Sequence, residues 1–148
     1  MDLILWRHAE AEEGTDDLAR NLTAKGRQQA ESAAAFLRRH LPAETRILVS
    51  PAVRTKQTAS ALTERYTLTP AIAPDASVHA VLKSVRWPDA EGTVLVVGHQ
   101  PTLGAVAASI LGSGHESLRI KKGALWWLSR RPGSTEPTVK LIISPEFF

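Results

Sequence analysis

Three short apolar runs in this chain are separated by stretches of helical periodicity, and this alternation is what most constrains the fold. The runs cover residues 3–6, 47–49 and 94–98, and their composition is typical of buried strands. Strands that alternate with helices form a mainly parallel sheet with helices on both faces. The sequence therefore predicts an α/β fold, arranged as a three-layer α/β/α sandwich.

The strand boundaries follow from the apolar runs and the turn signals beside them. We expect parallel strands at about 2–6, 46–49 and 93–97. Two more strands, at about 124–129 and 138–143, flank a turn that contains proline and glycine. They are expected to pair as a hairpin, which would give the mainly parallel sheet an antiparallel C-terminal edge.

Two helices are expected in the first half of the chain. Thr23 is a suitable N-cap for a helix that ends before Pro42. Ser50 is expected to cap a second helix, rather than to bind a ligand, with Pro51 in the first helical position and an end near Arg65.

The second half of the chain is expected to hold two further helices. One covers about 76–86, and the other begins at Pro101 and ends at Gly112. Residues 70–75 contain two prolines and are expected to form a short edge strand at best. Thr102 is interpreted as a helix cap rather than as a ligand.

Composition limits the class of protein. With 148 residues, the chain suits one domain, 1–148, with a real hydrophobic core. It has no cysteine, which excludes disulfides and thiolate nucleophiles. No run is long enough to cross a membrane, and a strand is expected so near the first residue that no signal peptide is predicted, so a cytoplasmic location is expected. The formal charge of +3 suits an anionic ligand, whereas the scattered lysines and arginines make nucleic acid an unlikely partner.

Cationic and imidazole side chains follow three of the predicted strands. Arg7 and His8 end the first run, Arg54 comes shortly after the second, and His99 follows the third. Ligands of open α/β sheets bind at the carboxyl ends of the strands, so we expect these four side chains to converge. Arginine grips phosphate oxygens with two N–H groups, and neutral imidazole is a good nucleophile. The pattern therefore predicts a compact site for a phosphoryl group.

Four segments, in order along the chain, resemble signatures of the histidine phosphatase superfamily, which is also called phosphoglycerate mutase-like. The short length and the opening Arg-His-Ala-Glu-Ala are similar to the SixA-type phosphohistidine phosphatases within it. The resemblance covers about residues 1–112, and its four segments are 7–9, 22–30, 50–59 and 97–102.

This resemblance implies a phosphoglycerate mutase-like fold and a phosphatase that acts through a phosphohistidine formed on His8. It also implies that Arg7 and Arg54 clamp the phosphoryl group and that His99 is the second imidazole in contact with it. Arg20 lies where SixA-type members carry a further phosphate-binding arginine. No cofactor is expected, and no histidine or acidic cluster has the spacing of a metal site.

The proton donor is the least defined member of the expected site. Larger members of the family carry a glutamate between the second and third motifs, and here Asp75 resembles that position only loosely. We take Asp75 as a possible general acid, with Glu10 and Asp17 as its competitors. A phosphohistidine substrate would suit this departure, because its imidazole leaving group needs less help from an acid than an alkoxide does.

Phosphohistidine on a signalling protein is the expected substrate, because the chain between Arg54 and His99 is too short for the cap that would enclose a small molecule. Three alternatives stay open: a phosphatase of small phosphoesters such as sugar or nucleotide phosphates, a mutase, and a catalytically silent phosphate-binding module. The expected partner is thus a phosphorylated protein or a small phosphoester, with no membrane.

Overall fold

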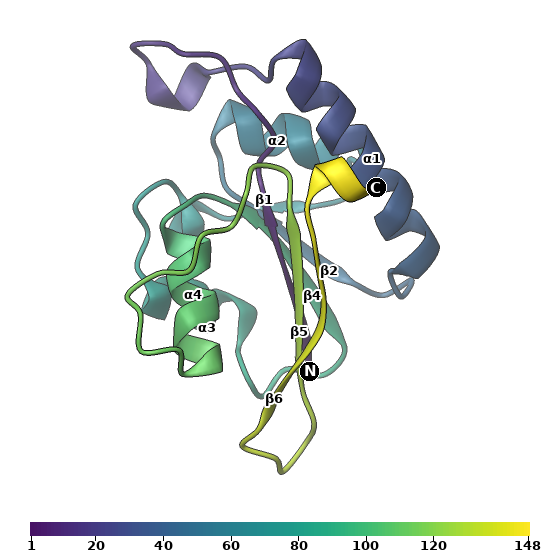
Figure 1. Cartoon of the computed structure of the whole chain (residues 1–148), viewed down its shortest axis with the longest axis vertical. Coiled ribbons are helices and arrows are strands. Elements are labelled where there is room, and N and C mark those ends of the chain that lie inside the picture. Colours follow the sequence, from purple (N-terminus) through teal and green to yellow (C-terminus); the bar gives the residue numbers. More distant parts are fainter.

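A six-stranded mixed sheet forms the centre of the molecule (Figure 1). The structure is a computed structural model that describes residues 1–148. The strands lie in the order β3-β2-β4-β1-β5-β6. Their bounds are β1 Asp2–Arg7, β2 Arg46–Val49, β3 Thr67–Leu68, β4 Thr93–Gly98, β5 Leu125–Arg130 and β6 Pro137–Ile143. The first four are parallel, whereas β5 and β6 pair antiparallel, which confirms the predicted antiparallel edge.

Four helices cover the two faces of the sheet. Their bounds are α1 Ala24–His40, α2 Val53–Ser60, α3 Val78–Val85 and α4 Thr102–Leu111. One core cluster joins the sheet to α1 and α2, and another joins it to α3 and α4. Strand β1 contributes to both clusters. Leu3 and Leu5 pack on one face of the sheet, whereas Ile4 and Trp6 pack on the other. This arrangement confirms the predicted three-layer α/β/α sandwich.

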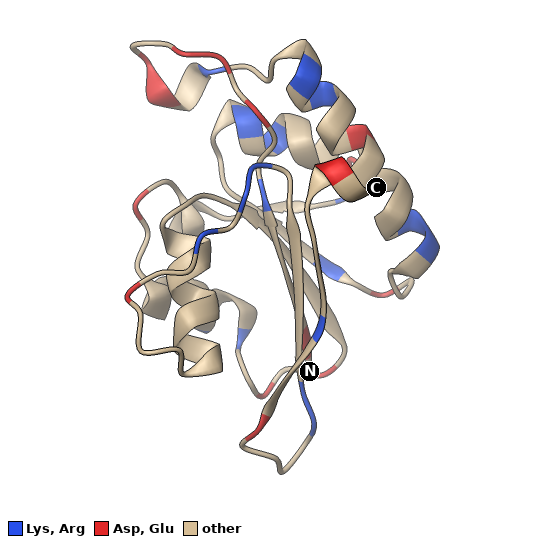
Figure 2. Ribbon diagram, viewed as in Figure 1, with Lys and Arg blue, Asp and Glu red and all other residues tan.

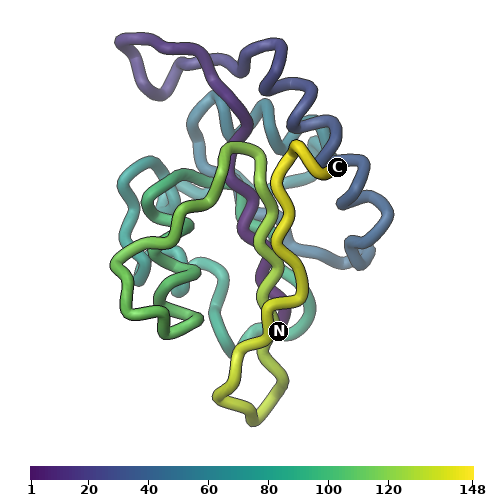
Figure 3. The backbone as a smooth tube through the Cα atoms, viewed as in Figure 1, coloured from purple at the N-terminus to yellow at the C-terminus, as the bar shows by residue number.

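The predicted strands of the sheet are confirmed to within one residue at each end. Figure 3 shows β1 running through the middle of the molecule, with the C-terminal hairpin beside it.

No helix in the chain is both long enough and apolar enough to cross a bilayer. That residues 1–148 form a single domain stays a prediction.

Helix α1 begins as its sequence predicts and packs closely against the segment that follows β1. The Thr23 hydroxyl accepts a hydrogen bond of 2.9 Å from the backbone N–H of Gly26. A Cβ atom at Gly26 would lie 2.0 Å from the carbonyl oxygen of Glu10, so only glycine fits there. The first turn of α1 thereby holds the chain just after His8.

Helix α2 differs from the prediction at both ends. It begins at Val53 rather than at Pro51, and its N-cap residue is Ala52, which has no side-chain acceptor; the Ser50 hydroxyl is bonded to His99 instead. It ends at Ser60 rather than near Arg65. Backbone bonds between residues three apart, such as Leu62 N–H to the Ala59 carbonyl, tighten the chain into a turn there.

Two further predictions were wrong. Residues 70–75 form no strand; Pro70 starts a 3₁₀ turn, η2 (Pro70–Ile72), because its fixed φ suits a helical first position, and the edge strand is β3 instead. Thr102 does not cap α4. It is the first residue of that helix, and its hydroxyl donates to the carbonyl of Ala76 in the neighbouring loop.

Candidate active site

The sheet brings the two histidines together because each follows one of two neighbouring parallel strands. Arg7, the last residue of β1, is in register with Gly98, the last residue of β4. His8 and His99 come next, and the His8 backbone N–H donates to the Gly98 carbonyl at 3.0 Å. Ser50 leaves β2 in the same way, on the other side of β4. The three side chains therefore share the carboxyl edge of the sheet.

A pocket of about 330 Å³ opens at this edge, and all of its lining except one proline is polar or charged. It contains every residue of the expected site, including the less certain Arg20 and Asp75. The lining residues are Arg7, His8, Asp17, Arg20, Arg54, Pro74, Asp75, His99, Gln100 and Lys122.

His8 is held in a form suited to nucleophilic attack. Its Nδ1 lies 2.8 Å from the carbonyl oxygen of Ala9, so Nδ1 carries the proton and donates it there. The side chain is only 6% exposed, and this burial, together with the charges of Arg54 and Arg7, lowers the pKa of His8 to about 4. The ring is thus neutral at pH 7, and Nε2 is its unprotonated nitrogen.

His99 is fixed by Ser50, whose hydroxyl oxygen lies 2.6 Å from His99 Nε2. Both side chains are buried. Burial, and then the positive charge of Arg54, lowers the pKa of His99 to about 3. Its ring centroid lies 5.4 Å from that of His8. Ser50 thus orients the ring of His99. This role was not predicted from the sequence, although the place of Ser50 directly after β2, the strand beside β4, could have indicated it.

Arg7 and Arg54 enter the pocket from different elements. Arg7 is partly buried, and its Nη1 donates to the carbonyl of Ile120 at 2.8 Å. Arg54 stands in the first turn of α2 and is 4% exposed. Its Nη1 donates to the backbone carbonyl of Asp17 at 2.6 Å, and its Nη2 lies 3.2 Å from the Asp17 carboxylate.

Asp17 also binds Arg20. It lies in a 3₁₀ turn, η1 (Asp17–Ala19), and Arg20 Nη1 is 3.1 Å from its Oδ1. The hydrogen bond from Arg20, with the nearby charge of Arg54, holds the pKa of the Asp17 carboxyl below its usual range. The carboxylate is therefore ionised at neutral pH. From the sequence, Asp17 was expected only as a candidate acid, and its pairing with both arginines was not predicted.

The other acidic candidates are placed differently. Asp75 lines the pocket, is exposed, and has a φ of 68°, a left-handed conformation that aspartate tolerates. Glu10 does not line it, because its carboxylate accepts a hydrogen bond of 2.8 Å from the Thr23 hydroxyl at the start of α1. Gln100 and Lys122 were not expected at the site. Gln100 directly follows His99, whereas nothing in the sequence indicated Lys122, which comes from the loop before β5.

Basic residues also surround the pocket. Figure 2 shows lysines and arginines at the starts of α1 and α2 and in the loop that leads into β5, all near the carboxyl end of β1. The exposed Arg119 lies close enough to Arg7 to lower the pKa of the Arg7 guanidinium, although burial is the larger cause. This edge of the sheet therefore favours an anion.

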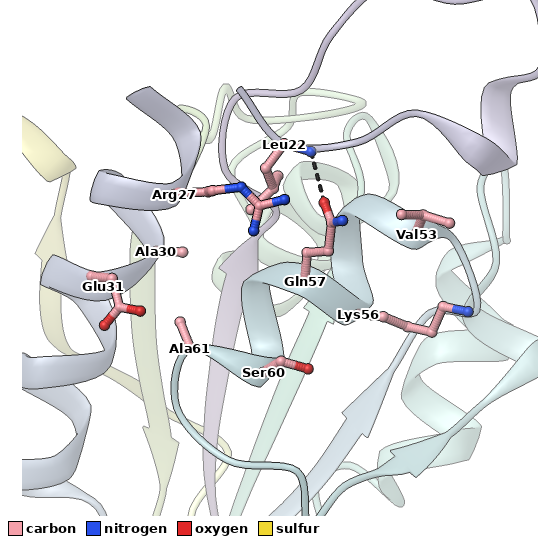
Figure 4. Close-up of a pocket in the computed structure, with 9 residues that line it drawn as sticks. All are labelled: Leu22, Arg27, Ala30, Glu31, Val53, Lys56, Gln57, Ser60 and Ala61. Carbon is pink, nitrogen blue, oxygen red and sulfur yellow. Dashed lines mark hydrogen bonds between the residues drawn. The ribbon is translucent and has the colours of Figure 1, made fainter. Parts of the chain in front are cut away.

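A second pocket, of about 400 Å³, lies between α1 and α2 and contains none of the expected site residues (Figure 4). Gln57 lines it and accepts a hydrogen bond of 2.7 Å from the backbone N–H of Leu22. Nowhere in the chain do three histidine or acidic side chains gather in a way that could hold a metal ion.

Comparison with known proteins places these residues in a family. Residues 3–77 match the model of the histidine phosphatase superfamily, branch 1. The phosphohistidine phosphatase SixA homolog of Haemophilus influenzae is 32% identical over 128 residues, which is 76% of this chain and 78% of that protein.

Solved structures share the fold over almost the whole chain. The protein histidine phosphatase SixA, complexed with tungstate, has a TM-score of 0.83 and 23% identity, with 99% of each chain covered. A phosphoserine phosphatase mutant from Entamoeba histolytica, in complex with phosphoserine, has a TM-score of 0.74 and 16% identity, with 98% of each chain covered. The sheet, its order of strands and the family match agree: this chain belongs to the histidine phosphatase superfamily, branch 1, and is therefore a phosphatase.

Proposed function

We propose that this protein hydrolyses phosphohistidine on a partner protein, through a phosphoryl group carried transiently on its own His8. The observation that carries the proposal is the hydrogen bond from His8 Nδ1 to the Ala9 carbonyl, in a ring whose pKa is lowered to about 4. Nε2 then bears a lone pair in a pocket lined by Arg7, Arg20 and Arg54.

In the first step His8 Nε2 attacks phosphorus and the bond from phosphorus to the leaving group breaks. Charge spreads over the three equatorial oxygens, where the guanidinium groups of the pocket stabilise it. His99 is neutral, because its pKa is lowered to about 3, and we assign it as the second imidazole in contact with the phosphoryl oxygens. The leaving nitrogen of the substrate takes up a proton, for which Asp75 is the candidate donor.

In the second step a water molecule attacks phosphorus and the bond to His8 Nε2 breaks. Inorganic phosphate leaves, the proton of the water passes to solvent, and His8 returns to its neutral form. Dividing one transfer into two replaces a difficult displacement by two easier ones. We propose that neither step uses a metal ion, because the pocket supplies arginines and imidazoles to the phosphoryl group and only two carboxylates, Asp17 and Asp75.

Two observations support a protein as the substrate. The relative from Haemophilus influenzae is a phosphohistidine phosphatase SixA homolog. The chain from the end of α2 to the start of β4 holds only short elements, β3, η2 and α3, so no separate cap stands over the site. A cytoplasmic location is part of this proposal.

The test compares kcat/KM for a phosphohistidine-bearing domain with kcat/KM for phosphoserine, sugar phosphates and nucleotide monophosphates, with and without EDTA. We expect the phosphohistidine domain to be preferred by at least about tenfold, with no effect of EDTA, since each tenfold needs only about 1.4 kcal/mol of transition-state binding. Faster turnover of one small phosphoester would favour the alternative of a small-molecule phosphatase. Tight binding of phosphate without turnover of any substrate would indicate a silent binding module.

A further inference from the structure

The carboxylate of Asp17 is bound by Arg20 and Arg54, two of the arginines that are proposed to hold the phosphoryl group. Asp17 Oδ1 is 3.1 Å from Arg20 Nη1, and Asp17 Oδ2 is 3.2 Å from Arg54 Nη2. The two oxygens of one anionic group therefore bridge two guanidinium groups from different segments of the chain. A phosphoryl group bound by the same two arginines would make this same bridge.

Arg54 is committed to Asp17 through both of its terminal nitrogens. Nη1 donates to the backbone carbonyl of Asp17 at 2.6 Å, and Nη2 donates to its carboxylate. Bidentate binding of phosphate by arginine uses two N–H groups of one guanidinium. Each terminal nitrogen carries two N–H groups, and Asp17 takes one from each, so a phosphoryl group bound through these same two N–H groups has to displace Asp17.

The segment that carries Asp17 has few buried contacts. Residues 12–19 are all exposed, and η1 buries none of its residues. The base of the segment is fixed: Leu22 N–H donates to Gln57 Oε1 at 2.7 Å (Figure 4), and Glu12 N–H donates to the Asn21 carbonyl at 2.8 Å. Its tip is tied to the body of the protein through Arg54. Segments with few buried contacts are the ones that open at low cost in free energy.

We propose that Asp17 is a displaceable internal anion, which competes with the phosphoryl group for Arg20 and Arg54 and thereby sets the affinity of the site for its substrate. The inference rests on the proposed function, because it takes Arg20 and Arg54 as phosphate ligands. A group with two negative charges displaces the carboxylate, whereas a singly charged anion such as a carboxylate or a phosphodiester does not. Asp17 thus selects for terminal phosphoryl groups.

The rival role for Asp17 is proton donation to the leaving group. The geometry argues against that role, because both oxygens of the Asp17 carboxylate are bound by arginines, which favour the ionised form and hold the pKa of the carboxyl below its usual range. The two roles also predict opposite results on removal of the charge: loss of a competitor strengthens phosphate binding, whereas loss of a donor slows the chemical step.

The test is Asp17→Asn, with Asp16→Asn as the matched control. Asp16 is the adjacent exposed residue, and its side chain makes no capping hydrogen bond, so the control removes one negative charge from the same loop without touching the arginines. The dissociation constant of inorganic phosphate is measured by calorimetry at pH 7.5. We expect it to fall about fivefold in Asp17→Asn, which removes the carboxylate from two ion pairs near the surface, and to stay unchanged in Asp16→Asn.

Turnover supplies a second readout. We expect the KM of the phosphohistidine domain to fall in Asp17→Asn and kcat/KM to rise. An unchanged or larger dissociation constant for phosphate would overturn the proposal, as would a loss of kcat that grows with the pKa of the leaving group. Phosphate binding is read without turnover, so failure of the wild-type protein to hydrolyse phosphohistidine would count against the proposed function alone.

Discussion

The ring centroids of His8 and His99 lie 5.4 Å apart, and both rings are buried and neutral at pH 7. Strand pairing sets this separation, because each histidine directly follows one of two neighbouring parallel strands. Burial lowers the pKa of both rings most, and the charges of the arginines that line the same pocket lower it further, so neither ring takes up a second proton at neutral pH. The same arrangement thus supplies an unprotonated nitrogen and a cationic surround for a phosphoryl group.

The buried histidines should make stability depend on pH. His8 has a folded pKa of about 4 and an ordinary value of 6.5, so the unfolded chain binds more protons between these pH values. The free energy of unfolding should therefore rise with pH across this window, and fall as the protein is acidified. For His8 alone the change from pH 6.5 to pH 4 is about 3 kcal/mol.

Urea unfolding of His8→Asn at several pH values measures this contribution. Asparagine keeps a donor for the Ala9 carbonyl but does not titrate, so the variant should show a flatter dependence on pH than the wild type. Parallel curves for His8→Asn and the wild type would show that His8 titrates normally in the folded protein.

Ser50→Ala should impair both stability and catalysis. The change leaves Nε2 of the buried His99 without its partner at 2.6 Å, which costs about 1–3 kcal/mol of unfolding free energy. We also expect kcat to fall by about tenfold, because the second imidazole loses its fixed orientation. Ser60→Ala, at the last residue of α2 and outside the pocket that contains His8 and His99, is the control for both. A Ser50→Ala enzyme with wild-type kcat would mean that the orientation of His99 does not matter.

Gly26→Ala should destabilise the protein by about 2 kcal/mol or more, because its Cβ would lie 2.0 Å from the Glu10 carbonyl oxygen. Thermal unfolding measures the loss, and Gln28→Ala, at an exposed position of α1, is the control. Since Glu10 lies two residues after His8, we expect kcat/KM to fall as well, even where the variant is fully folded. A Gly26→Ala protein as stable as Gln28→Ala would show that α1 does not hold this segment closely.

The sheet was predictable because its signals are local. The apolar runs that become β1, β2 and β4 mark buried strands, and parallel pairing places the residues after them at one edge. His8 and His99 could therefore be placed in one pocket from the sequence, without knowledge of any contact between them.

What could not be predicted depends on contacts between distant residues. Ser50 has the local sequence of a helix cap, but its hydroxyl is bonded to His99, 49 residues away, and α2 begins only at Val53. The local sequence of Asp17 is that of an ordinary loop residue, and its contact with Arg54, 37 residues away, is seen only in the folded chain. Lys122 joins the pocket only because β5 pairs with β1.

His8 should carry the phosphoryl group during turnover. Rapid quenching of the wild-type protein with labelled substrate, followed by mass spectrometry, should find an adduct on His8 that is stable in alkali and labile in acid. The adduct should be absent from His8→Ala, and that variant should lose activity by orders of magnitude. A His8→Ala protein that is folded and keeps more than about a tenth of wild-type kcat/KM would contradict the covalent mechanism, because loss of a nucleophile costs far more than that.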